Sequence, residues 1–467
     1  MRPGRITLFF ACIIAVLAVI CAIFPSDGVT VGSHSFYLPT IHDLAEANRP
    51  TNEEDDQPVD TIPAEVVQLS DSITYLQTFS DSSDARFWLP DSLYFDSFWE
   101  IAENAVRQDR IVRVMHYGDS QIEMDRMTSQ LRKYMQETFG GGGPGMIPYR
   151  TIIPTLAVSQ STSGELIHLS SFGDSTVTRS RGNYGLMMQS FRLNGESTLS
   201  IRASKHASVD NAVKQFSRLQ LVFNNRGDDL SIVVDDKSID SSYSSHINTQ
   251  GVGSVTYSTS SPTTHFRLRT RGNVDLYCVT VDNGPGVAVD NIPMRGCSGQ
   301  QFTTVGRELL TEAYAQLNVG LIILQFGGNS VPYLNTEKSI STYCRSIGKQ
   351  IDYIHRCCPG AKILFVGPSD MSTRHKGNLQ TYPMLPALID SLAATAVSHN
   401  AAYWSIYHAM GGWNSMVNWN KKGLAGSDYI HFSQQGADKM GAKLAQALAD
   451  NYQLFLLRRR LNQHTEE

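Results

Sequence analysis

The sequence predicts an α/β protein, a doubly wound parallel sheet that carries an inserted all-β sandwich or jelly roll. Two observations lead to this prediction. Buried apolar strands alternate with helical patterns before residue 150 and again after residue 285, which is typical of a parallel sheet with helices on both faces. Between these parts, short alternating runs recur with Gly, Asn, Asp or Ser between them. That pattern is typical of an antiparallel β-domain.

Length and composition indicate several domains and argue against some functions. A chain of 467 residues is expected to hold two or more domains. The net charge is −5 and no long basic stripe is present, so nucleic acid is not an expected partner. The sequence contains no C-x-x-C, H-E-x-x-H or EF-hand pattern. We therefore expect no metal and no other cofactor.

The N-terminal segment predicts export. Arg2 and Arg5 precede the uncharged, apolar run Ile6–Phe24, which is typical of a signal peptide or a single membrane anchor. No A-x-A site follows, and Ile20 occupies the place where lipoprotein processing needs a small residue. We therefore expect residues 1–24 to be an uncleaved anchor, with the bulk of the chain exported. If the segment is cleaved, the protein is secreted.

Residues 25–84 are predicted to be a linker, because they combine an acidic run with scattered Pro, Ser and Thr. The first part of the α/β domain is assigned to residues 85–150, with a helix over Leu93–Gln108, a strand over Ile111–Met115 and a helix over Met124–Phe139. The inserted β-domain is assigned to residues 151–284. Its expected strands are Leu166–Ser170, Ser190–Leu193, Leu199–Ala203, Leu219–Asn224, Leu230–Val234, Ser254–Tyr257, His265–Arg269 and Val274–Val281.

The second part of the α/β domain is assigned to residues 285–467. Its expected strands are Val287–Ile292, Leu321–Phe326, Ala361–Val366 and Ala401–Tyr407. Its expected helices are Phe302–Leu317, Ser341–Cys357, Met384–His399 and Gln434–Leu448, and the stretch Met410–Ser427 is expected to be irregular.

Polar residues or glycines follow the ends of several predicted strands. Ser120 lies in the turn after the first strand, Gly296 follows the second and Asn329 follows the third, while Asp428 and His431 come after the last. The carboxyl ends of parallel strands meet at one edge of a sheet, so these residues are expected to come together. Ester hydrolysis by a serine needs a base, an acid that orients this base, and donors for the oxyanion. This set supplies a candidate for every role.

These residues lie in four sequence blocks that resemble those of the SGNH, or GDSL-type, hydrolases. The blocks are GDSQIE at Gly118–Glu123, the MRGCSG segment with its central Gly296, GGN at Gly327–Asn329, and D-x-x-H at Asp428–His431, and they occur in the family's order. Ser330 stands where the family often has an aspartate. No G-x-S-x-G elbow is present, which argues against an α/β-hydrolase.

The resemblance implies a flavodoxin-like fold and assigns roles to individual residues. Ser120 is the expected nucleophile, with Asp428 and His431 as the other two catalytic residues. The expected oxyanion hole consists of the N–H groups of Ser120 and Gly296 and the side-chain amide of Asn329. In addition, Asp370 and Trp413 are candidates for lining the pocket.

In domain order the chain is similar to exported bacterial SGNH enzymes that remove acetyl groups from peptidoglycan or other polysaccharides. This similarity implies a serine O-acetylesterase that acts on an O-acetylated polysaccharide and is anchored to the cytoplasmic membrane, facing the periplasm. Two alternatives stay open. One is a membrane-anchored polysaccharide O-acetyltransferase that uses the same triad, for which a membrane acyltransferase is a candidate partner. The other is a non-catalytic glycan-binding protein.

Overall fold

The computed structural model describes residues 29–31, 34–36, 64–82, 86–173, 179, 182–236, 241–375 and 377–466. Strands β1 (Val29–Val31) and β2 (His34–Phe36) pair antiparallel and belong to one compact unit, and residues 64–467 form a second unit. The predicted anchor, Ile6–Phe24, lies outside the described residues. Among the residues that are described, no helix has both the length and the hydrophobicity to cross a membrane.

The second unit is built around a parallel sheet, as predicted. In the described part of the chain this sheet has six strands in the order β14-β4-β15-β16-β19-β3. All neighbours pair parallel except β3, which pairs antiparallel with β19 at the edge. Along the chain, the parallel strands therefore follow the order 2-1-3-4-5 of flavodoxin-like sheets. The strands are β3 (Phe87–Trp88), β4 (Ile111–Gly118), β14 (Gly286–Pro293), β15 (Val319–Gln325), β16 (Lys362–Gly367) and β19 (Ala402–Ser405).

Helices cover both faces of this sheet. On one face, Ile323 of β15 shares a core with Trp99 and Leu444, while the adjacent Ile322 packs on the other face with Ile347. Successive strand residues point to opposite faces, which explains why the strand sequences are apolar at nearly every position. The first face is covered by α4 (Asp96–Asn104), α5 (Thr128–Phe139) and α11 (Gln434–Glu466), and the second by α6 (Arg307–Ala315), α7 (Glu337–Cys357) and α8 (Leu385–Ser398).

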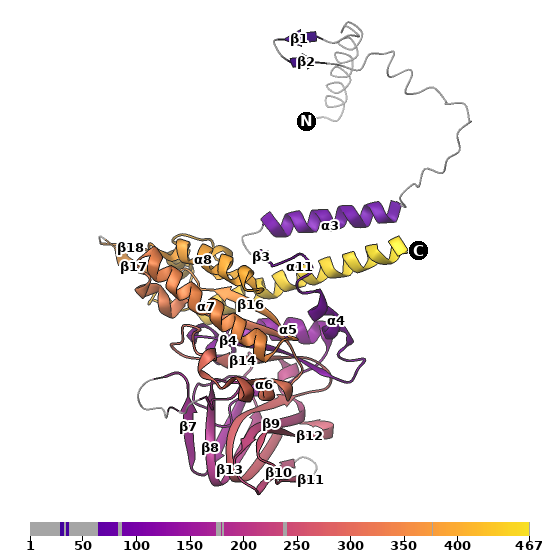
Figure 1. The fold of residues 1–467 in the computed structure, drawn as a ribbon, viewed down its shortest axis with the longest axis vertical. Helices are drawn as coiled ribbons and strands as arrows, with labels where there is room; N and C mark the ends of the chain where they lie inside the picture. Colours follow the sequence, from indigo (N-terminus) through magenta and orange to yellow (C-terminus); the bar gives the residue numbers. More distant parts are fainter. Residues whose placement is uncertain are drawn as a thin grey trace, which may run out of the picture. The chain divides into compact units, whose positions relative to one another are not determined.

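The inserted β-domain is confirmed as a separate antiparallel sheet. Its nine described strands curl around a common apolar core. Figure 1 shows β7 to β13 gathered on one side of the parallel sheet and its helices. The strands are β5 (Gly145–Ile147), β6 (Val158–Ser163), β7 (Leu166–Ser170), β8 (Gln189–Ala203), β9 (Phe216–Asn225), β10 (Leu230–Asp236), β11 (Ser241–Ile247), β12 (Gly251–Thr263) and β13 (His265–Asp282).

Two strands of this domain are longer than the sequence pattern predicts. The expected breaks between Leu193 and Leu199 and between Arg269 and Val274 are wrong, because β8 and β13 run through both. Gly195 and Gly272 lie directly opposite each other in the ladder and both have positive φ. Glycine adopts this conformation at little cost, so the pairing of the two strands continues through both positions.

The inserted domain is fixed firmly to the parallel sheet. β5 pairs with β13 and lies beside β14. Val222 of β9 and Tyr277 of β13 belong to the same buried cluster as Met115 and Tyr117 of β4. Because the two sheets share a core, the position of the insert relative to the carboxyl edge of the parallel sheet is set by packing.

The region predicted to be a linker contains a helix, α3 (Ala64–Ser82), which lies along α11 (Figure 1). Val66, Leu69, Ile73 and Leu76 are half-buried, and their heptad-like spacing suits helix-to-helix packing. The prediction that the last helix ends at Leu448 is also wrong, because α11 continues to Glu466. This longer helix provides the surface against which α3 packs.

Short elements complete the unit. The stretch predicted to be irregular contains α10 (Ser415–Lys421). The others are the 3-10 turns η1 (Ser120–Asp125), η2 (Asn211–Val213), η3 (Phe302–Thr304) and η4 (Gly328–Tyr333), the helix α9 (Ile406–Ala409) and the hairpin of β17 (Ser372–His375) and β18 (Asn378–Thr381).

Candidate active site

The predicted site residues lie after adjacent strands of the parallel sheet. Ser120 follows β4, Gly296 follows β14 and Asn329 follows β15, and these three strands are neighbours in the order β14-β4-β15. The chain reverses its direction of winding between β4 and β15, and ligands of open α/β sheets bind at such a switch point. The topology therefore brings the three residues to one crevice, as the sequence predicted.

Ser120, His431 and Asp428 form a continuous hydrogen-bonded chain. The Ser120 Oγ lies 2.8 Å from Nε2 of His431. On the other side of the ring, Nδ1 lies 2.7 Å from Oδ2 of Asp428. A hydrogen bond from Nδ1–H to the carboxylate leaves Nε2 free to accept the serine proton. A serine in such a chain can act as a nucleophile if the histidine takes its proton.

The aspartate of this chain is held by its own turn. Oδ1 of Asp428 accepts the backbone N–H groups of Ile430 and His431 at 3.0 and 3.1 Å. Burial by itself would raise the pKa of Asp428, but the hydrogen bonds from the His431 side chain and from these two N–H groups outweigh it and lower the pKa. The carboxyl group is therefore ionised at neutral pH and orients the imidazole.

Two residues that sequence reasoning missed join the serine and histidine segments. The side chain of Gln121 donates to the Ile430 carbonyl at 2.7 Å and accepts from the Phe432 N–H at 3.3 Å. The guanidinium of Arg126 donates to the carbonyls of Ser120 and Phe432 at 2.7 and 3.3 Å. The contacts with Ile430 and Phe432 link positions more than 300 residues apart, and no local sequence pattern predicts them.

The oxyanion side of the site contains Gly296 and Asn329. Gly296 has a φ of +74°, a conformation that favours glycine. Nδ2 of Asn329 donates to Oδ2 of Asp119 at 3.2 Å and to the carbonyl of Cys297 at 3.0 Å. The amide is therefore held in a defined plane, and an oxyanion would have to share one of these N–H groups.

Asp119 connects the nucleophile turn to Asn329. Its Oδ1 accepts the Gln121 N–H at 3.0 Å while its Oδ2 binds Asn329. Burial raises the pKa of Asp119 to about 6, although the hydrogen bond from Gln121 acts to lower it. The side chain is only 4% exposed, so its charge is poorly solvated.

A cavity of about 560 Å³ opens onto Ser120 and His431. Gly296 and Asn329 line it, and so does Tyr333, whose side chain is 78% exposed at the rim. Its lining also includes Asp119, Gln121, Glu123, Arg126, Arg295, Gln325, Phe326, Gly328, Pro332, Pro368, Ser369, Met371, Ile406 and Ile430.

Neither Asp370 nor Trp413, the two candidates for pocket lining, contributes to this cavity. Asp370 is fully buried and accepts hydrogen bonds from the Thr381 hydroxyl at 2.7 Å and from the Met416 N–H at 2.8 Å. It therefore ties the β17–β18 hairpin to the start of α10. Trp413 is 47% exposed in the loop before α10. Ser369 and Met371, on either side of Asp370, do line the cavity, so the Asp370 side chain is held away from it by its hydrogen bonds to Thr381 and Met416.

The segment that follows Ser120 is conformationally strained. The expected continuous helix from Met124 to Phe139 is wrong, because α5 begins at Thr128. Met124, Asp125 and Met127 have φ values of 59°, 60° and 59°, which are costly for residues with a Cβ. Glu123, just before them, is buried and forms two hydrogen bonds with Arg295 at 2.7 and 2.5 Å. This ion pair anchors the strained segment next to Gly296.

Within the described ranges, no group of three His, Cys, Asp or Glu side chains is arranged to hold a metal ion. What the arrangement of Ser120, His431 and Asp428 can do chemically is acyl transfer through a serine.

Comparisons with known proteins place the fold. No family model matches the sequence, and no curated protein matches it. A solved structure of a peptidoglycan O-acetylesterase is 21% identical, covers 78% of this chain and 96% of its own length, and superposes with a TM-score of 0.62. A family two carbohydrate esterase from Cellvibrio japonicus is 11% identical over 64% of this chain and 99% of its own, with a TM-score of 0.26.

The periplasmic domain of a lipopolysaccharide acetyltransferase from Salmonella ser. Paratyphi A is 11% identical over 35% of this chain and 73% of its own, with a TM-score of 0.25. The last two superpositions are too loose to support an argument. By fold, this chain resembles a peptidoglycan O-acetylesterase, and the prediction of a flavodoxin-like parallel sheet with an inserted β-domain is confirmed.

Proposed function

We propose that this protein is a serine esterase that removes O-acetyl groups from a cell-envelope or other polysaccharide. The observation that carries the proposal is the hydrogen-bonded chain from Ser120 through His431 to Asp428, with distances of 2.8 and 2.7 Å. The fold likeness to a peptidoglycan O-acetylesterase supports acetyl as the acyl group and a glycan as the alcohol. The apolar segment Ile6–Phe24 supports export, with the chain anchored at the outer face of the cytoplasmic membrane or secreted after cleavage.

The proposed first half-reaction forms an acetyl-enzyme. The Ser120 Oγ attacks the acetyl carbonyl carbon while Nε2 of His431 takes the hydroxyl proton. The carbonyl oxygen becomes an oxyanion, which accepts hydrogen bonds from the N–H groups of Ser120 and Gly296 and from the Asn329 amide. The bond between carbonyl carbon and sugar oxygen then breaks, and His431 returns the proton to the departing sugar hydroxyl.

The second half-reaction regenerates the enzyme. A water molecule attacks the acetyl carbon as His431 accepts one of its protons, and the Ser120 oxygen leaves and takes that proton back. Acetate is the second product. Asp428 stabilises the imidazolium that forms in each half-reaction, without itself being protonated.

The solvent exposure of His431 and Asp428 favours hydrolysis over transfer of the acetyl group to another sugar. The side chains of His431 and Asp428 are 38% and 47% exposed. Solvent therefore reaches the two side chains that would activate a water molecule, which favours hydrolysis of an acetyl-enzyme. An acetyltransferase that uses the same residues would need to exclude water from this position.

The test compares the wild-type protein with Ser120→Ala on 4-nitrophenyl acetate and on an O-acetylated glycan. We expect the substitution to lower kcat by about 10⁴-fold or more, because loss of one residue of a catalytic triad typically lowers the rate by at least this factor. Ser260→Ala, at an exposed position of the insert, is the matched control and should keep full activity. Equal turnover by wild type and Ser120→Ala would refute the proposal, and binding of the glycan without turnover would favour the glycan-binding alternative.

A further inference from the structure

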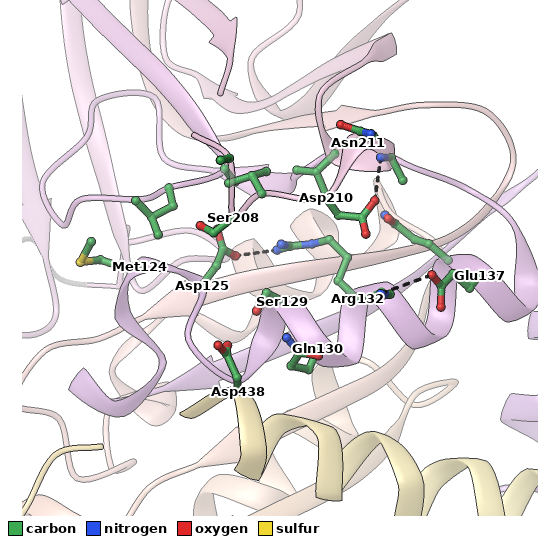
Figure 2. A pocket seen from close by; sticks show the side chains of 18 of the residues that line it. Met124, Asp125, Ser129, Gln130, Arg132, Glu137, Ser208, Asp210, Asn211 and Asp438 are labelled. Atoms are coloured by element: carbon green, nitrogen blue, oxygen red, sulfur yellow. Dashed lines mark hydrogen bonds and ion pairs between the residues drawn. The ribbon is translucent and has the colours of Figure 1, made fainter. Parts of the chain in front are cut away.

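A second cavity, of about 510 Å³, lies between the inserted domain and the helices of the parallel sheet. The loop Ala207–Val213, which connects β8 to β9, forms one wall, and α5 together with the start of α11 forms the other. Figure 2 shows Ser208, Asp210 and Asn211 on the loop, opposite Ser129 and Gln130 of α5 and Asp438 of α11. Neither domain makes this cavity alone.

The second cavity is adjacent to the cavity that opens onto Ser120 and His431, which we call the catalytic cavity. Glu123 and Arg126 line the catalytic cavity, whereas Met124 and Asp125, between them in the chain, line the second. A second segment of chain also passes from one cavity to the other, because His431 lines the catalytic cavity and Gln434 lines the second. Two short segments of chain, residues 123–126 and 431–434, therefore contribute to both cavities.

Hydrogen bonds hold in place the two chain segments that lie between the cavities, which we call the wall. Arg126 donates to the Phe432 carbonyl at 3.3 Å, which joins the two crossing stretches. On the far side, Asp125 accepts from Arg132 at 2.8 Å and from Thr155 at 3.0 Å. These hydrogen bonds fix the wall on the side of each cavity. A ligand in one cavity would therefore lie at a fixed distance from a ligand in the other.

The lining of the second cavity suits a neutral ligand with many hydroxyl groups. It contains four carboxylates and two cationic side chains, so its formal charge is −4 + 2 = −2. The cations are already paired, Arg132 with Asp125 at 2.8 Å and Lys133 with Glu137 at 3.8 Å. Phosphate-rich or otherwise polyanionic polymers would be repelled. The carboxylates, hydroxyls and amides match the donors and acceptors of a sugar. The four carboxylates are those of Asp125, Glu137, Asp210 and Asp438.

We propose that the second cavity binds sugar residues of the same polysaccharide chain whose acetyl ester occupies the catalytic cavity. This inference rests on the proposed function and deepens it, because it makes the substrate a neutral polymer longer than one or two sugars. It also assigns a task to the inserted domain, which supplies one wall through Ala207–Val213.

The experiment measures binding and turnover as a function of chain length. The probes are oligosaccharides of β-1,4-linked N-acetylglucosamine, a disaccharide and an octasaccharide, each with and without O-acetyl groups. Ser208→Trp and Gln130→Trp each place a bulky side chain in the second cavity. In full-length protein that also carries Ser120→Ala, we expect each to weaken calorimetric binding of the octasaccharide about tenfold, a change of ~1.4 kcal/mol. Binding of the disaccharide should change less than twofold.

Turnover supplies the second readout. With Ser120 intact, kcat/KM for the O-acetylated octasaccharide should exceed that for the disaccharide, and Ser208→Trp should remove most of this difference. Ser260→Trp lies at an exposed site of the insert outside both cavities. This variant should keep the wild-type kcat/KM for both substrates.

The outcomes separate the two proposals. Equal octasaccharide binding by the parent and by both tryptophan variants would overturn the inference, whatever the turnover results. Equal losses for both chain lengths would also overturn it, because they would indicate general damage. Tighter binding of a polyanionic glycan of equal length would contradict the charge argument. Absence of turnover by wild type with intact length-dependent binding would instead remove the esterase proposal and keep the second cavity as a glycan site.

Discussion

Asp119 introduces a pH-dependent contribution to stability beside the proposed nucleophile. Burial raises its pKa from 3.8 to about 6, so the folded state binds this proton more tightly than the unfolded state does. The contribution of Asp119 to the free energy of unfolding is therefore greatest below pH 4 and falls as the pH rises through about 6. A shift of this size corresponds to about 3 kcal/mol. The ionised group nevertheless remains in place because Gln121 and Asn329 donate to it.

We expect Asp119→Asn to remove this pH dependence. Chemical denaturation of wild type and variant should be followed from about pH 4 to about pH 7. Wild type should lose stability relative to the variant across that range by about 3 kcal/mol. Parallel curves for the two proteins would contradict a raised pKa at Asp119. Other carboxyl groups cancel in the difference, since both proteins contain them.

Tyr333 is predicted to bind the sugar that carries the acetyl group, or its neighbour, at the rim of the catalytic cavity. Its ring is 78% exposed and lines the cavity only four residues after Asn329. An exposed aromatic ring offers an apolar face to the C–H groups of a sugar and keeps its hydroxyl in water. Tyr333→Ala should raise KM for an O-acetylated glycan about tenfold, or ~1.4 kcal/mol, with little change in kcat.

The control for this prediction is Tyr333→Phe, which keeps the ring and should retain most of the affinity. Steady-state kinetics on 4-nitrophenyl acetate supply the comparison, because this substrate has no sugar to bind the ring. If Tyr333→Ala lowered kcat equally on both substrates, the ring would have a structural role in the site and the prediction would fail.

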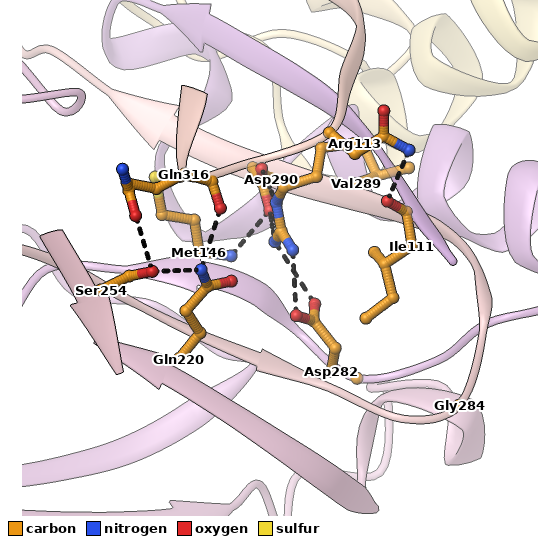
Figure 3. Close-up of polar contacts among 12 residues, drawn as sticks. Ile111, Arg113, Met146, Gln220, Ser254, Asp282, Gly284, Val289, Asp290 and Gln316 are labelled. Atoms are coloured by element: carbon orange, nitrogen blue, oxygen red, sulfur yellow. Dashed lines mark hydrogen bonds and ion pairs between the residues drawn. The ribbon is translucent and has the colours of Figure 1, made fainter. Parts of the chain in front are cut away.

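Among elements, the contact between β4, β13 and β14 depends on a buried ion cluster (Figure 3). Arg113 of β4 donates to Asp282 of β13 at 2.9 Å and to Asp290 of β14 at 2.9 and 2.5 Å. The Met146 N–H of β5 also donates to Asp290 at 2.8 Å. All three charged side chains are at most 2% exposed, so the cluster joins the inserted domain to the parallel sheet without help from solvent.

Arg113→Met should destabilise the protein by about 3–5 kcal/mol, because it leaves two carboxylates buried without a cation. Thermal or chemical unfolding measures the loss, which should shrink as the pH falls and the carboxyl groups become protonated. Arg269→Met removes the cation of a more exposed pair with Asp235 and should cost less than about 1 kcal/mol. Similar losses for the two variants would show that the buried cluster contributes no more than a surface pair.

For the whole molecule, an open catalytic cavity predicts hydrolysis as the main reaction. With 4-nitrophenyl acetate as donor and an oligosaccharide of N-acetylglucosamine as acceptor, we expect most of the acetyl group to appear as acetate. The physical reason is the exposure of His431 and Asp428, at 38% and 47%. Mass spectrometry of the oligosaccharide and enzymatic determination of acetate measure the partition. Transfer of most of the acetyl group to the sugar would favour the acetyltransferase alternative instead.

Several elements could be predicted because their signals are local. The apolar runs of β4, β15 and β16 indicate strands buried on both faces, and all three occur close to the expected residues. The helix α3 and the second half of α11 were not expected, since each is stabilised by the other from a distant part of the chain. The glycines inside β8 and β13 were interpreted as turns, because a glycine within a strand has the same local sequence pattern as a glycine in a turn.

The fold class and the order of the candidate catalytic residues could be predicted from the sequence, because strand ends and short motifs are properties of neighbouring residues. Ser120, Gly296, Asn329, Asp428 and His431 were all named from strand ends and spacing. The folded structure adds the contacts that join the serine and histidine segments, the hydrogen bonds that hold the Asp370 side chain away from the cavity, and the second cavity beside the first. These features depend on contacts between segments far apart in the chain, which no local pattern encodes.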